Sequence, residues 1–321
     1  MSNSRQQTTV HSNVISAPAQ AVYGLVADVT RWPAIFAPSL HVHQLEFDKH
    51  AERFQLWALV NGKVKTWTSR RTLDSRQLHI SFEQERTQPP FASMGGEWTF
   101  RALPGNRSEV VLTHHFTTVD GESLDAVTAA VDHNSEQELA ALGCLAQLEY
   151  PVTDVVFSFE DTMRLGGAAS DAYQFVYRSD EWPQRLPHVT RVALREGPPG
   201  VQDMEMDTVT ADGSAHTTRS IRLCFPAERI VYKQLVPPAL LFGHSGGWTF
   251  TAGPDGAVAT ARHTVAINPA AIPAVLGTNR TLADARDFLR TALGANSRAT
   301  LALAGAYAQS QDVPFPGRVG R

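Results

Sequence analysis

Short stretches in which apolar and polar residues alternate follow one another along the first 120 residues of the chain. A period of two is typical of a β-strand with one buried face. The alternation predicts strands near residues 8–15, 42–48, 53–60, 63–73, 77–84, 95–103 and 108–119. Two helices come early in this series: Pro18 leads one that runs to about Val29, and a short one lies around Trp32 to Phe36.

A different spacing begins at Glu122 and continues to Leu148. Apolar residues now recur every three or four positions, at Leu124, Val127, Val131, Leu142 and Leu145. This spacing predicts a long amphipathic helix. Strands joined by turns such as Asn61-Gly62, followed by this helix, predict an α+β unit. We expect its antiparallel sheet to curl around the helix and to leave an internal cavity.

The chain contains an internal duplication. The matching landmarks are Trp32-Pro33 with Trp182-Pro183, Trp98-Thr99-Phe100 with Trp248-Thr249-Phe250, and Tyr23 with Tyr173, and each pair is separated by 150 residues. Because the chain has only six Trp, two Trp pairs at one spacing indicate a true repeat. We therefore expect one domain over residues 1–150 and a second over 151–321, with an Ala/Pro-rich insertion near 269–280 and a disordered tail from about 309.

The overall composition is that of an ordinary globular chain. Apolar residues make up 43%, and 32 acidic against 28 basic residues give a net charge of −4, which does not favour nucleic-acid binding. Cys144 and Cys224 lie too far apart in sequence to suggest a disulfide framework or a cysteine-rich metal site. With no apolar leader or membrane-spanning stretch in the sequence, we expect a cytoplasmic protein that does not bind a membrane.

Strand alternation also identifies polar side chains that share a face with apolar ones. In residues 63–73, Ser69 and Arg71 fall on the face of Trp67, so we expect both to point into the cavity, although an exposed Arg71 on a wet face is the alternative. In residues 108–119, His114 falls on an otherwise apolar face, where it is either catalytic or a hydrogen-bonded core residue.

The buried stripe of the long helix carries a carboxylate, Glu138. Burying a charge is costly unless it is paired, so Glu138 should contact His114 or Arg71, unless it sits at the edge of the stripe and reaches solvent. The second copy repeats only part of this set. Ser220, Arg222 and His263 match the residues of the first copy, as Trp248 matches Trp98, but Thr300 stands where Glu138 would be.

Two other motifs carry less weight. Residues 243–247 read Gly-His-Ser-Gly-Gly, the pattern of a hydrolase nucleophile elbow, but a strand follows them where the elbow needs a helix. His41 and His43 share a strand face without a third ligand, so we expect no metal site. The sequence also lacks a phosphate-binding glycine loop.

The segments TWTSRRTLD (66–74), PPFASMGGEW (89–98), LTHHF (112–116) and DHNSEQEL (132–139) resemble the aromatase/cyclases of bacterial type II polyketide synthases. The resemblance covers nearly all of the first copy, and the repeated landmarks extend it to a two-domain member. It implies the helix-grip fold of START and Bet v 1 domains. It also implies catalytic roles for Arg71, His114 and Glu138, where Glu138 replaces the family's aspartate.

The resemblance further implies first-ring aldol closure and dehydration of a poly-β-ketone without a cofactor. Arg71 would hold the enolate oxygen, His114 would move protons, and Glu138 would orient the imidazole. The substrate-binding cavity would be lined by Trp32, Phe36, Ser39, Trp67, Ser69, Met94 and Trp98. The substrate would already be ketoreduced, and the new ring bond would join its seventh and twelfth carbons.

The implied partners are an acyl carrier protein that delivers the substrate and the other synthase subunits. Arg70, Arg76 and Arg86 are candidates for a basic docking rim. A non-catalytic carrier of hydrophobic ligands is the alternative function, because the same fold serves that purpose elsewhere. A carrier does not need Arg, His and Glu together on the cavity wall, so the set favours an enzyme.

Overall fold

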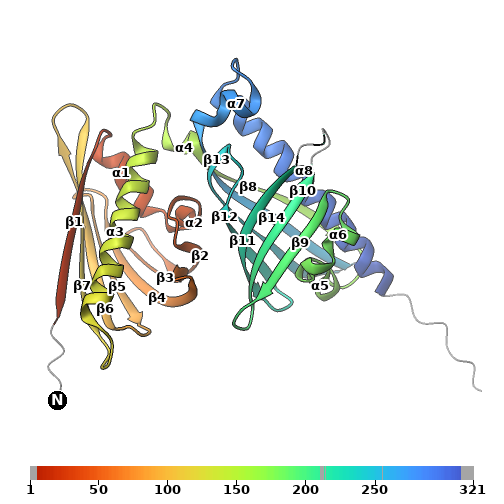
Figure 1. The fold of residues 1–321 in the computed structure, drawn as a ribbon, viewed down its shortest axis with the longest axis horizontal. Coiled ribbons are helices and arrows are strands. Elements are labelled where there is room, and N and C mark those ends of the chain that lie inside the picture. The colour runs from red at the N-terminus through yellow and green to blue at the C-terminus, as the bar shows by residue number, and fades with distance from the viewer. Residues whose placement is uncertain (1–5, 210–212, 214, 255, 312–321) are drawn as a thin grey trace, which may run out of the picture. The chain divides into compact units, whose positions relative to one another are not determined.

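The computed structural model describes residues 6–209, 213, 215–254 and 256–311 (Figure 1). Contacts divide the chain into two units, Met1–Val155 and Val156–Arg321, whereas the repeat predicts the boundary after residue 150.

The first unit consists of the following elements in chain order. They are β1 (Gln7–Ile15), α1 (Ala19–Ala27), the short helix η1 (Val29–Arg31), α2 (Trp32–Ile35), β2 (Ser39–Phe47), β3 (Ala51–Val60), β4 (Lys63–Asp74), β5 (His79–Arg86), β6 (Phe91–Leu103), β7 (Arg107–Thr118), α3 (Leu124–Ala146) and α4 (Val152–Val155). Its seven-stranded antiparallel sheet has the order β1-β7-β6-β5-β4-β3-β2, and α3 lies across the inner face of the sheet (Figure 1).

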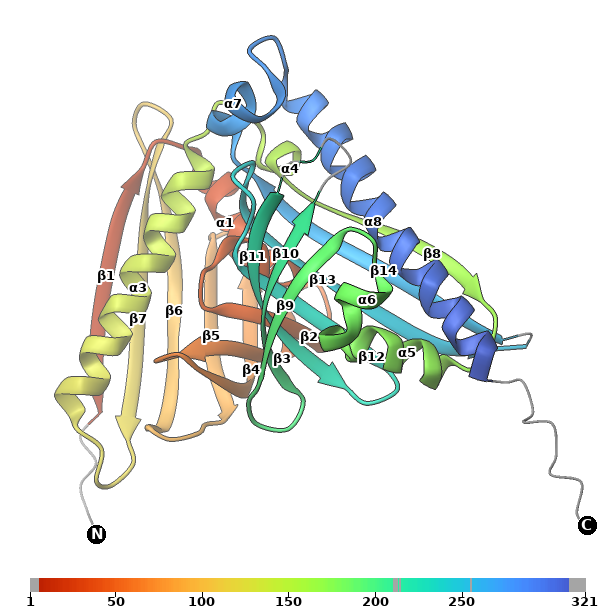
Figure 2. The same ribbon diagram turned by 45° about the vertical axis from the view of Figure 1, so that its right-hand side comes forward.

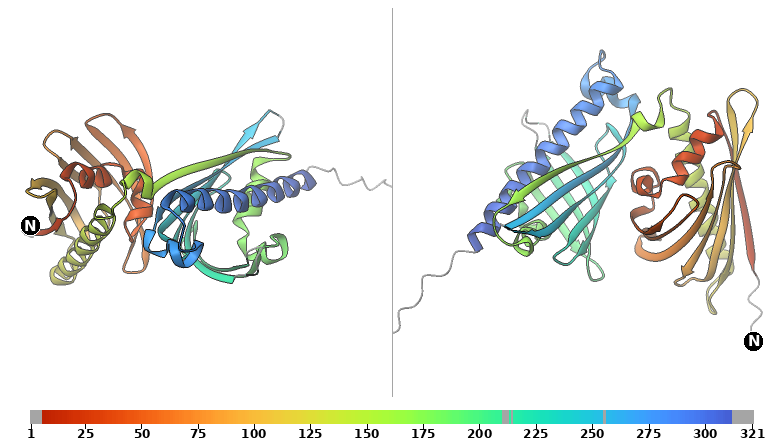
Figure 3. Two further views of the ribbon diagram at one scale, coloured as in Figure 1. Left: turned by 90° about the horizontal axis from the view of Figure 1, so that it is seen from above. Right: turned by 180° about the vertical axis from the view of Figure 1, so that it is seen from behind.

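The second unit repeats this order. Its elements are β8 (Val156–Leu165), α5 (Ala169–Tyr177), η2 (Ser179–Glu181), α6 (Trp182–Arg185), β9 (Val189–Glu196), β10 (Val201–Val209), β11 (Ala215–Phe225), β12 (Arg229–Val236), β13 (Leu241–Gly253), β14 (Gly256–Ile267), η3 (Pro269–Ala271), α7 (Ile272–Leu276) and α8 (Leu282–Gln311). The strand order β8-β14-β13-β12-β11-β10-β9 is equivalent, and α8 runs along the sheet (Figure 2). Figure 3 shows that both sheets are curved.

The landmark residues of the repeat make the same core contact in both units. Tyr23 on α1 meets Phe100 on β6 edge to face at 5.6 Å, and Tyr173 on α5 meets Phe250 on β13 in the same way at 6.0 Å. These contacts fasten the first helix of each unit to the sheet. The predicted fold, two sheets that each grip a long C-terminal helix, is confirmed.

Some element ends differ from the sequence-based expectation. The strand expected from residue 95 begins at Phe91, because Gly95 and Gly96 pair with β7 and do not interrupt the ladder. The tail expected to be disordered from about 309 is helical up to Gln311, and the rest of it lies outside the described residues. Across the described residues, no helix combines the length and apolar character that crossing a membrane requires.

Candidate active site

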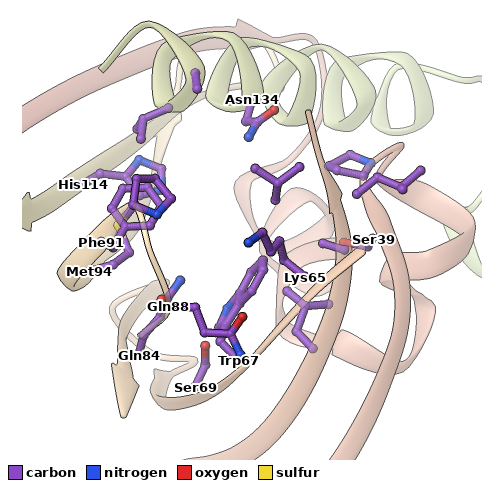
Figure 4. Close-up of a pocket in the computed structure, with 18 of the residues that line it drawn as sticks. Ser39, Lys65, Trp67, Ser69, Gln84, Gln88, Phe91, Met94, His114 and Asn134 are labelled. Carbon is purple, nitrogen blue, oxygen red and sulfur yellow. The ribbon is translucent and has the colours of Figure 1, made fainter. Parts of the chain in front are cut away.

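A cavity of about 540 Å³ lies between the sheet of the first unit and α3 (Figure 4). Its rim includes the exposed residues Asn61, Lys63, Gln88 and Glu122, which lie in or beside the β3–β4 turn, the β5–β6 loop and the segment before α3. Asn61 and Gly62 have positive φ values of 50° and 71°, which fits the tight turn at this edge. Since β4 and α3 both start at the rim and run inward, residues later in either element lie deeper in the cavity.

The helix α3 places a polar series on the cavity wall. Ser123 caps the helix by accepting a hydrogen bond from the Ala126 N–H at 3.3 Å. Residues spaced by three and four then face inward, so that Asn134, Ser135 and Glu138 line the cavity. Asn134 points into it in Figure 4.

Strand alternation places His114 of β7 on the sheet side of the cavity. The pairing register aligns Arg71, Phe82, Gly96 and His114 in one row across β4, β5, β6 and β7. The Phe82 ring meets the His114 ring edge to face at 5.5 Å. A Cβ atom on Gly96 would lie 2.7 Å from Phe82 Cζ, so the glycine makes room for this ring beside the histidine.

The hydrogen bonds of Ser135 determine which nitrogen of His114 is basic. Ser135 Oγ donates to the Val131 carbonyl at 2.8 Å and lies 3.4 Å from His114 Nδ1. Since the hydroxyl proton is used, Oγ accepts from Nδ1–H, which leaves Nε2 as the unprotonated nitrogen. Burial lowers the pKa of His114 to about 4, and the nearby His11 and His115 act in the same direction. The imidazole is therefore neutral near pH 7 and able to accept a proton.

Glu138 lines the cavity one helical turn beyond Asn134. Burial raises the pKa of its carboxyl to about 7. Among the described residues, the hydrogen bonds give it no partner, and the imidazole of His114 contacts Ser135 instead. The expectation that Glu138 orients His114 is therefore wrong in this structure, because the serine occupies the position on α3 that faces Nδ1. A carboxyl with a pKa near 7 keeps its proton well above the usual range and can instead act as a proton donor.

Arg71 is 2% exposed and its donors are almost fully used by the protein. Nε donates to Glu52 at 2.6 Å and Nη2 contacts the same carboxylate. Nη1 donates to the Val26 carbonyl at 2.8 Å, and Nη2 donates to Ala27 at 2.7 Å. Within the described residues, four of the five N–H groups of Arg71 thus have protein acceptors. The guanidinium closes the C-terminal end of α1, where carbonyl groups lack helical partners.

The equivalent arginine does the same in the second unit. Arg222 donates to the carbonyls of Val176 at 2.6 Å and Tyr177 at 3.3 Å, at the end of α5. Its side-chain partners are Gln202 at 2.7 Å and Ser179 at 2.6 Å. A neutral glutamine therefore stands where the first unit has Glu52.

The predicted substrate-binding residues divide into two groups. The cavity lining includes Trp32, Ser39, Trp67, Ser69, Met94 and Trp98, but it does not include Phe36. Phe36 is buried behind Trp32, with the rings 5.5 Å apart.

Among the polar lining residues that were not predicted from the sequence, Lys65, Gln84 and Gln88 point into the cavity in Figure 4. Lys65 shares the strand face of Trp67 and could have been found by extending the alternation of β4 by two residues.

The histidine of the second unit has more protein partners. His263 Nε2 lies 2.7 Å from Ser297 Oγ, and Nδ1 lies 3.0 Å from His244 Nε2 and 3.2 Å from the Tyr232 hydroxyl. Ser220 and Trp248 are buried in this unit, and Thr300 donates its hydroxyl proton to the Asn296 carbonyl at 2.9 Å. Both imidazole nitrogens of His263 thus face protein groups.

The structure also places the serine of the motif at residues 243–247, which was set aside from the sequence. Residues 243–247 lie inside β13, so Ser245 has neither the turn nor the helix of a nucleophile elbow. The described part of the chain holds no group of three His, Cys, Asp or Glu residues that could bind a metal ion.

Comparison with known proteins gives consistent results. The family model described as "Polyketide cyclase / dehydrase and lipid transport" matches residues 15–140. The actinorhodin polyketide synthase bifunctional cyclase/dehydratase of Streptomyces coelicolor is 55% identical over 96% of this chain and 99% of its own. The granaticin polyketide synthase bifunctional cyclase/dehydratase of Streptomyces violaceoruber is 51% identical, with 93% of each chain covered. The crystal structure of the di-domain ARO/CYC BexL matches with a TM-score of 0.80 and 45% identity, over 94% of this chain and 99% of that one.

Proposed function

This chain belongs to the polyketide cyclase/dehydrase family, and we propose that the cavity of its first unit closes and dehydrates the first ring of a nascent poly-β-ketone. The protein is an aromatase/cyclase of aromatic polyketide biosynthesis. In the proposal the substrate is ketoreduced and tethered to a carrier protein. The observation that carries the assignment to this cavity is that His114, which is neutral near pH 7, and Glu138, whose pKa is raised to about 7, both line its walls.

His114 acts as the base of the aldol step. Its Nε2 takes a proton from an acidic methylene between two carbonyls, and the resulting carbanion attacks a second carbonyl carbon to form the ring bond. The imidazolium then returns the proton to the new alkoxide, which becomes a hydroxyl. His114 is neutral again at the end of this step.

Glu138 acts as the acid of the dehydration step. His114 removes a second methylene proton, the electron pair forms the new double bond, and the hydroxyl leaves as water with the proton that Glu138 donates. The proton on His114 then returns to the Glu138 carboxylate through solvent. The net change is the loss of one water molecule, and no oxidant or reductant is needed.

Arg71 is a positioning residue in this proposal and does not carry the enolate charge. Its bonds to Glu52, Val26 and Ala27 hold the end of α1, and its guanidinium lies 5.0 Å from the Trp32 ring that lines the cavity. An oxyanion would have to compete with a buried carboxylate for the same donors, which an ion pair of this kind disfavours.

Other subunits of the polyketide synthase are partners of this protein. We assign delivery of the substrate to an acyl carrier protein in the cytoplasm. Two of the three arginines expected at the docking rim do not suit that role. Arg76 follows the inner end of β4, away from the cavity rim, and Arg70 is paired with Glu85 at 3.0 Å. Arg86, at the end of β5 that leads to the rim, and Lys63 provide the basic charge there. Binding of the loaded carrier should weaken as salt rises.

Reconstitution with the upstream synthase tests the proposed function. Wild-type protein should give the aromatised ring by product mass, whereas His114→Gln should return shunt products without the correct first ring and Glu138→Gln should accumulate the cyclised, hydrated species. His115→Gln and Glu136→Gln are matched controls, because these neighbours lie off the cavity wall. Normal product at the normal rate from His114→Gln, with the protein shown to be folded by circular dichroism, would overturn the assignment.

A further inference from the structure

Lys65 is a cation on the cavity wall to which no role has been assigned. It lies on β4, two residues before Trp67 on the same strand face, and its side chain points into the cavity (Figure 4). The lysine is half-buried, whereas Lys63 at the rim is exposed. The ammonium therefore faces the space that substrate would fill.

The other charged groups of the cavity do not neutralise Lys65. Arg71 forms its ion pair with Glu52, and Glu122 is exposed at the rim. Glu138 lies deeper on α3, where burial disfavours its charged form, and His114 is uncharged near pH 7. Within the part of the chain that the structure describes, no carboxylate forms an ion pair with Lys65.

Several other polar side chains that line the cavity are neutral. Ser39, Gln84, Gln88 and Asn134 can donate or accept hydrogen bonds, but they bring no negative charge. The rest of the nearby wall is apolar, with Trp67 next on the strand face. A partly desolvated ammonium in such surroundings is stabilised most by an anion, so the complementary charge is expected on the ligand.

The chemistry of the substrate supplies such an anion. A methylene between two carbonyls loses a proton to give an enolate, whose negative charge lies on the two oxygens. We propose that Lys65 is an oxyanion-binding residue, whose ammonium binds the enolate oxygen of a 1,3-dicarbonyl unit in the cavity. This inference rests on the proposed function for the class of ligand. Lys65 would provide the positive charge for the enolate oxygen, because the guanidinium of Arg71 is already held in its ion pair with Glu52.

Benzoylacetone, a small aromatic 1,3-diketone, is a suitable probe because its enolate has an ultraviolet absorption distinct from that of the neutral form. Titration of the bound probe should show its apparent pKa lowered by about one unit or more in the wild type, as expected for an opposite charge within a few ångströms. Lys65→Met should abolish this lowering, and Lys65→Arg should restore it. Arg70→Met, on the outer face of the same strand, should titrate as the wild type does.

The test separates this inference from the proposed function. His114→Gln should lose turnover in the reconstituted system but keep the lowered pKa of the bound probe. An unchanged titration in Lys65→Met overturns the role of Lys65, whatever the turnover assay gives. A second result would also overturn the role of Lys65. If Lys65→Met weakens the binding of free phosphopantetheine but leaves the lowered pKa of the bound probe unchanged, the lysine contacts the carrier's tether and not the enolate.

Discussion

Replacing Glu138 by Gln should make the protein more stable at alkaline pH while it removes the dehydration step. In the folded chain, burial raises the pKa of this carboxyl from 4.5 to about 7. Below pH 4.5 the group is protonated in both the folded and the unfolded chain, so it does not affect the free energy of unfolding. Between pH 4.5 and 7 the unfolded chain loses the proton while the folded chain keeps it. Wild-type stability therefore falls through this range and stays low above it.

The size of the effect follows from the same rise in pKa. A rise from 4.5 to about 7 corresponds to about 3 kcal/mol at about 1.4 kcal/mol for each pH unit. Because the carboxyl opens to the cavity and part of its surface meets solvent, we expect about half of this, roughly 1 to 2 kcal/mol. Glutamine has nearly the same shape but no charge, so the variant should escape this loss above pH 7.

Urea unfolding at pH 5 and pH 8 measures the difference between variant and wild type. Comparing the two proteins at each pH removes the contribution of the second unit, which unfolds in both. The advantage of Glu138→Gln should be small at pH 5 and reach its full size at pH 8, and Glu136→Gln on the exposed face of α3 should show no such trend. A difference independent of pH, or an infrared carboxyl band that titrates near 4.5, would refute the reasoning.

Two further predictions concern the buried arginine and the second unit. Arg71→Ala should destabilise the protein by about 3 kcal/mol or more, because Glu52 stays buried at 2% exposure without its ionic partner and keeps only a neutral donor, Gln44 at 3.2 Å, among the described residues. Glu52→Gln should cost less in the same urea measurement, since a glutamine already holds the arginine of the second unit, and an equal loss would contradict this account. His263→Gln should lower turnover less than His114→Gln in reconstitution; equal losses, with stability matched, would indicate a second working site.

Local patterns in the sequence were enough to predict the fold, because alternation and helical spacing depend only on neighbouring residues. The same rule placed Ser69 and Arg71 on the inner face of β4. It did not identify the partners of Arg71, since the carbonyls of Val26 and Ala27 approach only when α1 packs on the sheet. Applying the alternation to β3 would have placed Glu52 on the face of buried Phe54, and so would have pointed to the ion pair.

The contact between Glu138 and His114 was expected because a buried charge needs a partner. The structure meets the same physical requirement differently: burial raises the pKa of Glu138 to about 7, which favours the neutral form of the carboxyl. Sequence spacing alone could not show whether the buried carboxyl of Glu138 is neutralised by a charged partner or by a bound proton. It also could not show that Phe36 packs behind Trp32, because that depends on the turn of α2 rather than on any period.

The two units differ in the residues that surround the inward-facing histidine of the sheet. In the second unit the register aligns Arg222, Tyr232, Gly246 and His263, so a tyrosine replaces Phe82 of the first unit. Its hydroxyl and the imidazole of His244, which stands where the first unit has Met94, lie within hydrogen-bonding distance of His263 Nδ1.

An imidazole serves as a base through a nitrogen that the protein leaves unoccupied. Phe82 and Met94 bring no hydrogen-bonding group of comparable strength, so among the described residues Nε2 of His114 keeps that freedom. His263 does not, because Ser297 lies 2.7 Å from its Nε2. The capping arginine is present in both units because both must close the same helix. The unoccupied nitrogen of His114 and the carboxyl of Glu138 with its raised pKa occur together in the first unit, and they are what the proposed chemistry requires.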